Sequence, residues 1–195
     1  MDAAAEQPVD HTNATRALHL ILLIAVLHQL ASSQFMEKPP PGKGASMIFI
    51  LHEYVGMASF TIVTAFWLCA VFRKRGTAFA RLLPWFSTSR LREVRLDGAE
   101  QAALLFRLKA PPGRSGALAN AVQGLGLVTV SAMSLTGTLF YLVGDSVFRD
   151  DVLAMHRLVA NLMWAYLVGH GGAAVIHHLC GRNIMSAMLP RARRS

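Results

Sequence analysis

Residues 47–72 read MIFILHEYVGMASFTIVTAFWLCAVF, an apolar stretch that ends at a basic run. The hydrocarbon core of a bilayer is about 30 Å thick, and a helix needs about 20 mostly apolar residues to cross it. Three further windows meet this length, at residues 17–35, 117–143 and 152–180. The sequence therefore predicts an all-α membrane protein, in which residues 1–195 form a single bundle of four transmembrane helices.

The composition also favours the bilayer as the solvent. Hydrophobic residues make up 53% of the chain and charged residues only 15%, and the mean hydropathy is positive, which is unusual for a soluble domain. A soluble helical bundle would need polar faces that the four windows lack. The net charge of +8 does not indicate nucleic-acid binding, because most of the basic residues flank the predicted spans.

The distribution of these basic residues predicts the orientation of the bundle. Ten of them lie between residues 73 and 114, and four more follow residue 181. By the positive-inside rule both segments are cytoplasmic, so an even number of spans places the N- and C-termini in the cytoplasm as well. Acidic residues outweigh Arg16 before the first window, which argues against a cleavable signal peptide, so we expect the first span to be retained.

The connector at residues 73–116 is the one long segment predicted outside the membrane. It is too short for an independent core, and it interleaves arginines with leucine, phenylalanine and tryptophan. This pattern is typical of helices that lie at the headgroup interface. Two interpretations remain open: an amphipathic connector on the cytoplasmic leaflet, or a docking surface for a partner subunit.

Histidines are the candidate functional residues, because ionisable groups inside a bilayer cost free energy and usually mark function. Seven of them lie in or at the edge of the predicted spans: His19, His28, His52, His156, His170, His177 and His178. His156 and His170 are 14 residues apart, which on a helix places them within roughly 40° of one face and about 21 Å apart in depth. One helix could therefore serve two cofactors at two levels of the membrane.

The topology predicts a partner for each of these two histidines. His19 begins the first span on the cytoplasmic side and matches the depth of His170, whereas His52 matches His156 near the outer surface. Two facing imidazoles at each level are the arrangement that holds the iron of haem b. We therefore expect His19 and His170 to bind an inner haem iron, and His52 and His156 an outer one. A small metal site would instead cluster its ligands within a few ångströms.

Other polar residues have less specific interpretations. Arg157, or Arg149 in the outer loop, would neutralise a propionate of the outer haem, because a buried carboxylate needs a partner. His177 and His178 could reach a propionate, a quinone headgroup or only the lipid interface. His28 faces away from His19, and we expect it to make a hydrogen bond between helices.

Small residues near the paired histidines allow two interpretations. Gly56 and the glycines around His170 would either make room for a flat macrocycle or allow close helix packing. The third span contains no histidine, so we expect it to close the bundle without binding iron.

The paired histidines and their flanking residues resemble the bacterial cytochrome b561 family and the related cytochrome b subunits of nickel-iron hydrogenases. The resemblance covers nearly the whole chain. It is carried by Arg16-Ala-Leu-His19, by His52-Glu-Tyr-Val-Gly56 after an interval of 33 residues, by the 14-residue interval from His156 to His170, and by the stretch from His177-His178 to Met188-Leu189-Pro190. Two features depart from the family pattern: Leu20 stands where the family often has tryptophan, and the connector is longer than in the smallest members.

The resemblance implies a four-helix protein of the bacterial inner membrane that holds two non-covalent haems b and exchanges electrons with the quinone pool. We expect an electron-transfer subunit or carrier that links a donor protein to quinone. The alternatives are a stand-alone superoxide:quinone oxidoreductase and a haem-free membrane scaffold. For the former, Lys38, Lys43, Arg149 and Arg157 would attract the anion at the outer face. The expected partners are lipid, quinone and a redox partner protein, and no nucleic acid.

Overall fold

The computed structural model describes residues 11–37, 39, 44–73, 77–106, 116–144, 146–180 and 188–189. Lys38 and Lys43, which were considered for anion attraction, lie outside the described residues. Pro190 and all four basic residues after residue 181 also lie outside them.

Four of the described helices are long and apolar enough to cross a bilayer: α1 (Asn13–Ser32), α2 (Met47–Phe72), α5 (Ala117–Val143) and α6 (Arg149–Leu179). The predicted fold class is confirmed, and the predicted bounds of α2 and α5 are those observed. The first helix begins at Asn13 rather than residue 17, because Thr12 caps it and its hydroxyl accepts a hydrogen bond from the Thr15 amide (3.2 Å).

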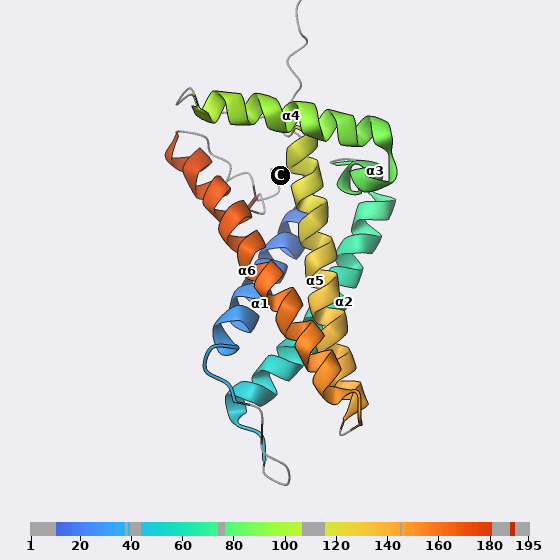
Figure 1. The fold of residues 1–195 in the computed structure, drawn as a ribbon, viewed down its shortest axis with the longest axis vertical. Helices are drawn as coiled ribbons and strands as arrows, with labels where there is room; N and C mark the ends of the chain where they lie inside the picture. The colour runs from blue at the N-terminus through green and yellow to red at the C-terminus, as the bar shows by residue number, and fades with distance from the viewer. Residues whose placement is uncertain are drawn as a thin grey trace, which may run out of the picture.

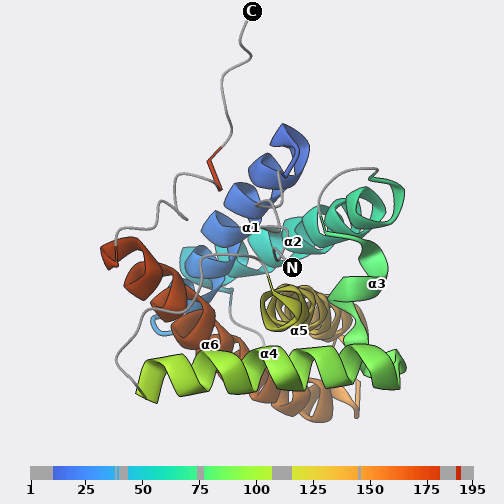
Figure 2. The ribbon, with the colours of Figure 1, turned by 90° about the horizontal axis from the view of Figure 1, so that it is seen from above.

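The long helices pack in sequence around a small apolar core. α1 packs along α2, α2 along α5 and α5 along α6, whereas the backbones of α1 and α6 make little contact. Figures 1 and 2 show α6 slanting across α5 and diverging from the other helices toward its C-terminal end. The core is formed by Leu30, Val63, Phe66, Ala70, Leu82, Leu127, Val130 and Met163. Most other apolar side chains of α6 are exposed, as expected for a surface that faces lipid.

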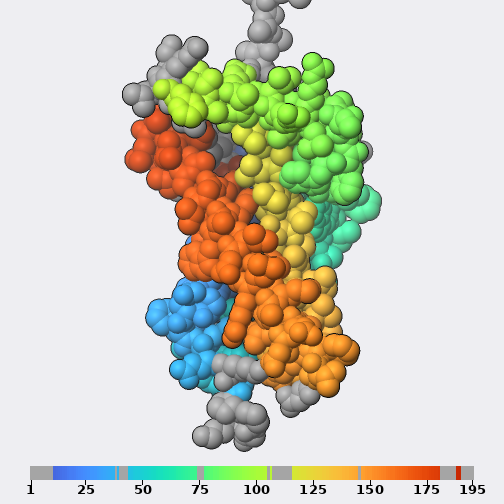
Figure 3. All heavy atoms as spheres, viewed as in Figure 1, coloured from blue at the N-terminus to red at the C-terminus, as the bar shows by residue number. Residues whose placement is uncertain are grey.

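The connector between α2 and α5 forms three short or polar helices at one end of the bundle. They are α3 (Phe79–Leu82), the 3-10 helix η1 (Pro84–Phe86) and α4 (Thr88–Phe106). α4 lies crosswise to the long helices and covers this end, with the surface hollowed beneath it between α5 and α6 (Figures 1 and 3). We call this end the α4 end and the opposite one the far end. An interfacial helix was predicted here, and the crosswise position fits both interpretations of the connector.

Two close approaches fix the connector to α5. The backbone of Leu82 in α3 presses on Gly124, where a Cβ atom would overlap the Leu82 carbonyl group. In α4, the carboxylate of Asp97 accepts a hydrogen bond from the amide of Leu118 (2.8 Å) and so caps the N-terminus of α5. Gln101 donates a second hydrogen bond to Asp97 (3.1 Å). α4 is therefore anchored by a charged cap rather than by apolar burial.

Candidate functional site

A cavity of about 440 Å³ lies toward the far end of the bundle, between residues of α1, α2, α5 and α6. We call it the far cavity. Its lining includes His52 and His156, together with Glu53, Arg157 and Asn161. The volume falls within the range of about 300–1,000 Å³ that is usual for small-molecule and cofactor sites.

The imidazole rings of His52 and His156 face each other across this cavity. Their centres are 6.4 Å apart and their planes are inclined by 89°. A metal–imidazole bond is about 2.0–2.1 Å long and a ring centre lies about 1.1 Å behind its nitrogen, so two imidazoles that share one metal have centres about 6.3 Å apart. The observed separation is compatible with both imidazoles binding one iron.

Each of these two rings has a hydroxyl group within hydrogen-bond distance of its Nδ1 atom. The Nδ1 atom of His52 lies 2.8 Å from the Ser32 hydroxyl, and that of His156 lies 3.0 Å from the Thr136 hydroxyl. The Ser32 hydroxyl can donate its own proton to the carbonyl oxygen of Gln29 (3.2 Å). The Thr136 hydroxyl can donate its proton to main-chain carbonyls of the preceding turn. With these bonds made, each hydroxyl accepts from Nδ1–H in the tautomer that leaves Nε2 able to bind a metal.

Gly137 provides room for the His156 ring. A Cβ atom at this position would lie 3.2 Å from Cε1 of His156, closer than most side-chain contacts. The sequence predicted that the third span would close the bundle without binding iron. The structure shows that α5 contributes both Gly137 and Thr136 to the surroundings of His156.

A second cavity, of about 140 Å³, lies toward the α4 end, and we call it the α4-side cavity. His19 from α1 and His170 from α6 both line it. The ring of Tyr166 stacks on that of His170, with centres 5.2 Å apart and planes inclined by 13°. This cavity is smaller than the far cavity, so its fit to a cofactor depends on the histidine pair and on nearby cations rather than on its volume.

Two arginines line the α4-side cavity. Arg16 is only 3% exposed, and its guanidinium donates to the carbonyl oxygens of His11 (2.9 Å) and Leu189 (3.2 Å). Arg73 donates to the Thr77 carbonyl oxygen, and its Nε is buried without a hydrogen-bond partner among the described residues. Burial lowers the pKa of Arg73 from its usual value. Buried cations of this kind suit the carboxylates of a haem, because a buried carboxylate needs a charged partner.

The structure separates the two arginines that were candidates for the outer haem. Arg157 lines the far cavity. Arg149 lies at the start of α6, where its guanidinium donates to the Gly144 carbonyl oxygen (3.0 Å) and covers the ring of Phe140 (4.8 Å to the ring centre). Arg149 therefore stabilises the turn between α5 and α6, and Arg157 is the better placed of the two.

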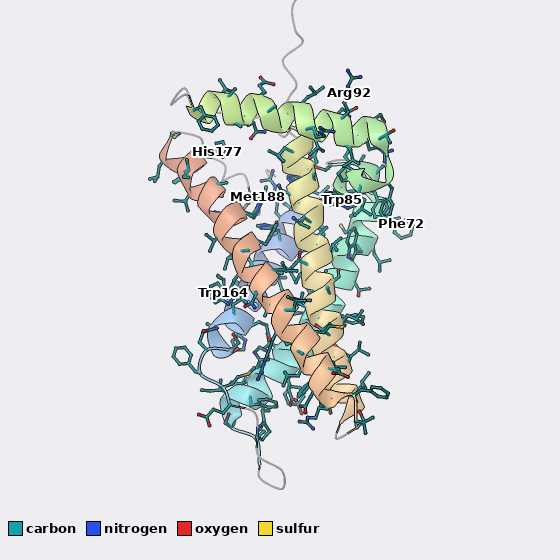
Figure 4. All side chains as sticks on the ribbon, viewed as in Figure 1. Phe72, Trp85, Arg92, Trp164, His177 and Met188 are labelled. Carbon is teal, nitrogen blue, oxygen red and sulfur yellow. The ribbon has the colours of Figure 1, made fainter. Side chains whose placement is uncertain are left out.

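The remaining histidines lie apart from the two pairs. His177 and His178 are in the last turn of α6, and neither lines the α4-side cavity. Figure 4 shows His177 near the end of α6, whereas Met188 lines the α4-side cavity. For His28, Nδ1 is buried without a hydrogen-bond partner among the described residues, so the predicted hydrogen bond between helices is not seen at this atom.

Five residues of these sites were not predicted from the sequence: Arg16 as a cavity residue, Ser32, Arg73, Thr136 and Tyr166. Arg16 and Tyr166 could have been predicted, since they lie three and four residues before His19 and His170 and so on the same helix faces. Ser32 and Thr136 could not, because their contacts depend on how neighbouring helices are rotated. In the described residues, no group of three or more histidine, cysteine or acidic side chains could hold a metal ion.

A bundle of membrane-crossing helices with paired histidines in internal cavities is the architecture of membrane cytochromes that hold haem between helices. The sequence model of the family described as prokaryotic cytochrome b561 matches residues 10–191, and the chain belongs to this family. Membership implies a multi-pass membrane protein that binds b-type haem and transfers electrons. Searches of curated proteins and of solved structures gave no match.

Proposed function

We propose that this chain is a dihaem cytochrome b that carries electrons between a donor and the quinone pool of the bacterial inner membrane. One haem iron would be bound by His52 and His156 in the far cavity, and the other by His19 and His170 in the α4-side cavity. The observation that carries the proposal is the separation of 6.4 Å between the rings of His52 and His156 in the far cavity, with a hydroxyl group at the Nδ1 atom of each ring.

The bound haems would supply reversible one-electron chemistry, and the protein holds and orients them. The four histidines would hold the two haems without leaving iron open to other ligands, which favours electron transfer over oxygen chemistry. Arg157 in the far cavity, and Arg16 with Arg73 in the α4-side cavity, would neutralise the haem carboxylates.

The two cavities lie close enough for electrons to pass between them. Val26, Val130 and Met163 line both cavities, so a single layer of apolar side chains separates them. Met163 is 3% exposed and lies seven residues from both His156 and His170, on the same face of α6. No ionisable side chain of this layer would have to change its charge as an electron crosses.

The orientation and the partners are part of the proposal. The cluster of basic residues in the connector supports a cytoplasmic location for the α4 end. Arg92 on α4 points away from the bundle (Figure 4), where it can contact either anionic lipid or a donor protein. Quinone would reach one of the two haems from the lipid phase.

A redox titration of purified variants, followed by the haem absorbance, tests this assignment. The wild-type protein should show two one-electron transitions, and addition of a quinol should reduce the haem. His156→Ala and His170→Ala should each lose a different transition and keep the other. His178→Ala is the matched control, because this exposed residue lies outside the α4-side cavity, and it should keep both transitions. Two unchanged transitions in either of the first two variants would refute the pairing.

A further inference from the structure

We propose that the hydroxyl groups of Ser32 and Thr136 are positioning groups for the haem of the far cavity, which we call the far-side haem. They would lower the reduction potential of this haem. They would do so by holding the Nδ1 protons of its two histidine ligands. This inference rests on the proposed function and deepens it, because it assigns the residues that set the redox poise of one of the two sites.

The proton count gives these hydroxyls a defined role. A hydroxyl group has one proton to donate. Thr136 donates that proton to the carbonyl oxygens of Ala132 (2.8 Å) and Met133 (3.1 Å), and Ser32 donates to Gln29 (3.2 Å). While these bonds are made, each hydroxyl accepts the Nδ1–H of His156 or His52. An acceptor on Nδ1–H keeps the proton on that nitrogen and directs the lone pair of Nε2 toward the metal.

The effect on the potential follows from ligand basicity. A hydrogen bond accepted from Nδ1–H moves electron density toward Nε2 and makes the imidazole a stronger donor. A stronger donor stabilises ferric more than ferrous iron, so it makes reduction less favourable. Both ligands of the far-side pair carry such a bond, and the two effects act in the same direction.

The α4-side pair has a different environment. In the described part of the chain, neither His19 nor His170 has a hydrogen bond of this kind, and His170 is instead stacked on Tyr166. The hydroxyl groups should therefore act on one haem only. The α4-side haem therefore serves as a reference for the far-side haem in the same molecule.

The geometry at Thr136 is rigid enough to sustain the effect. Thr136 is 4% exposed, and its side chain is fixed by bonds to the preceding turn of α5. The neighbouring Gly137 leaves the His156 ring just enough room beside the helix. Ser32 ends α1 and meets His52 where α1 and α2 pack together, a contact that Gln29 reinforces by donating to the His52 carbonyl oxygen (2.8 Å).

The chain offers closely matched controls for both hydroxyls. Thr129 is also buried on α5 and donates to its preceding turn (2.8 Å to Leu125), and it lines neither cavity. Thr64 on α2 donates to its preceding turn (2.8 Å to Phe60) and also lines neither cavity. Thr129→Val and Thr64→Val therefore reproduce the loss of a hydroxyl without the loss of a hydrogen bond to a histidine.

The experiment is a redox titration of Thr136→Val and Ser32→Ala, combined with low-temperature electron paramagnetic resonance of the ferric haems. The far-side haem is identified as the one that His156→Ala removes. We expect each variant to make its reduction about tenfold more favourable, an upward shift of about 59 mV for one electron. The g values of that haem alone should change. The α4-side haem and both control variants should keep the wild-type values, and Thr136→Ser should restore the potential.

Three results would overturn the inference. The first is a far-side potential in Thr136→Val and Ser32→Ala that equals that of the control variants. The second is an equal shift of both haems, and the third is a failure of Thr136→Ser to restore the potential. If Thr136→Val did not fold, the far-side potentials of Ser32→Ala and Thr136→Ser would still test the inference. A protein without two haems would contradict the proposed function itself, which keeps the two failures distinct.

Discussion

Gly126→Ala should weaken the α4-side site without touching either of its histidines. Gly126 on α5 faces Tyr166 on α6, and a Cβ atom at this position would overlap the hydroxyl oxygen and Cζ of the tyrosine ring. Tyr166 would have to move, and its ring stacks on His170 at 5.2 Å. The substitution should therefore disturb the orientation of His170 through one intermediate side chain.

The magnitude follows from three contributions. Overpacking of a close contact costs about 1–3 kcal/mol. Loss of the ring stacking adds about 0.5–1.5 kcal/mol where the ring cannot find a new position. Alanine is favoured over glycine within a helix by about 1 kcal/mol, which offsets part of the cost. Together these contributions give a net loss of about 0.5–3.5 kcal/mol, or roughly 2- to 400-fold weaker haem retention.

The assay is haem retention during detergent dilution, followed by absorbance for each haem separately. Gly169→Ala is the control, because it lies next to His170 and its added Cβ would meet nothing within 4 Å. Gly137→Ala is a second comparison, since its Cβ would crowd His156 at 3.2 Å instead. Gly126→Ala should release the α4-side haem first, Gly137→Ala the far-side haem, and Gly169→Ala neither. Equal retention in Gly126→Ala and Gly169→Ala would refute this reasoning.

Three further predictions concern contacts outside the histidine pairs. Asp97→Ala removes the cap of α5 and should cost about 1 kcal/mol, so hydrogen exchange should rise in α4; unchanged exchange would contradict the anchoring. Trp67→Phe loses the hydrogen bond from its indole to the Ser131 hydroxyl (2.9 Å) between α2 and α5. A double-mutant cycle with Ser131→Ala should give a coupling of about 0.6 kcal/mol, and a coupling of zero would argue against this bond. Arg157→Gln removes a cation from the far cavity and should lower the far-side potential by up to about 59 mV. Arg149→Gln should leave it unchanged, and equal shifts would argue against the assignment of Arg157.

Hydropathy alone predicted most of the fold. The windows at 47–72 and 117–143 coincide with α2 and α5, because long apolar runs bounded by polar residues leave little choice of ends in a bilayer. α1 begins at Asn13, before its predicted window, since the charge of Arg16 excluded the first turn from the apolar stretch. Burial of Arg16 in the α4-side cavity explains how the helix accommodates this charge.

The histidine pairs could be anticipated from spacing, and their surroundings could not. Fourteen residues between His156 and His170 place two side chains on one face of any regular helix. The contact between Thr136 and His156, by contrast, depends on the rotation of α5 against α6, which single-sequence periodicity does not specify. An interfacial helix was predicted in the connector, but its attachment to α5 was not, because this attachment depends on Asp97 reaching the first turn of α5.

The central claim is that two haems b are held by four histidines in one chain. Pyridine haemochrome quantification on the purified, folded protein, with the polypeptide measured by amino-acid analysis, tests it most directly. The account predicts two haems b per polypeptide in the wild type and one in His156→Ala. A single haem or none in the wild type would contradict it.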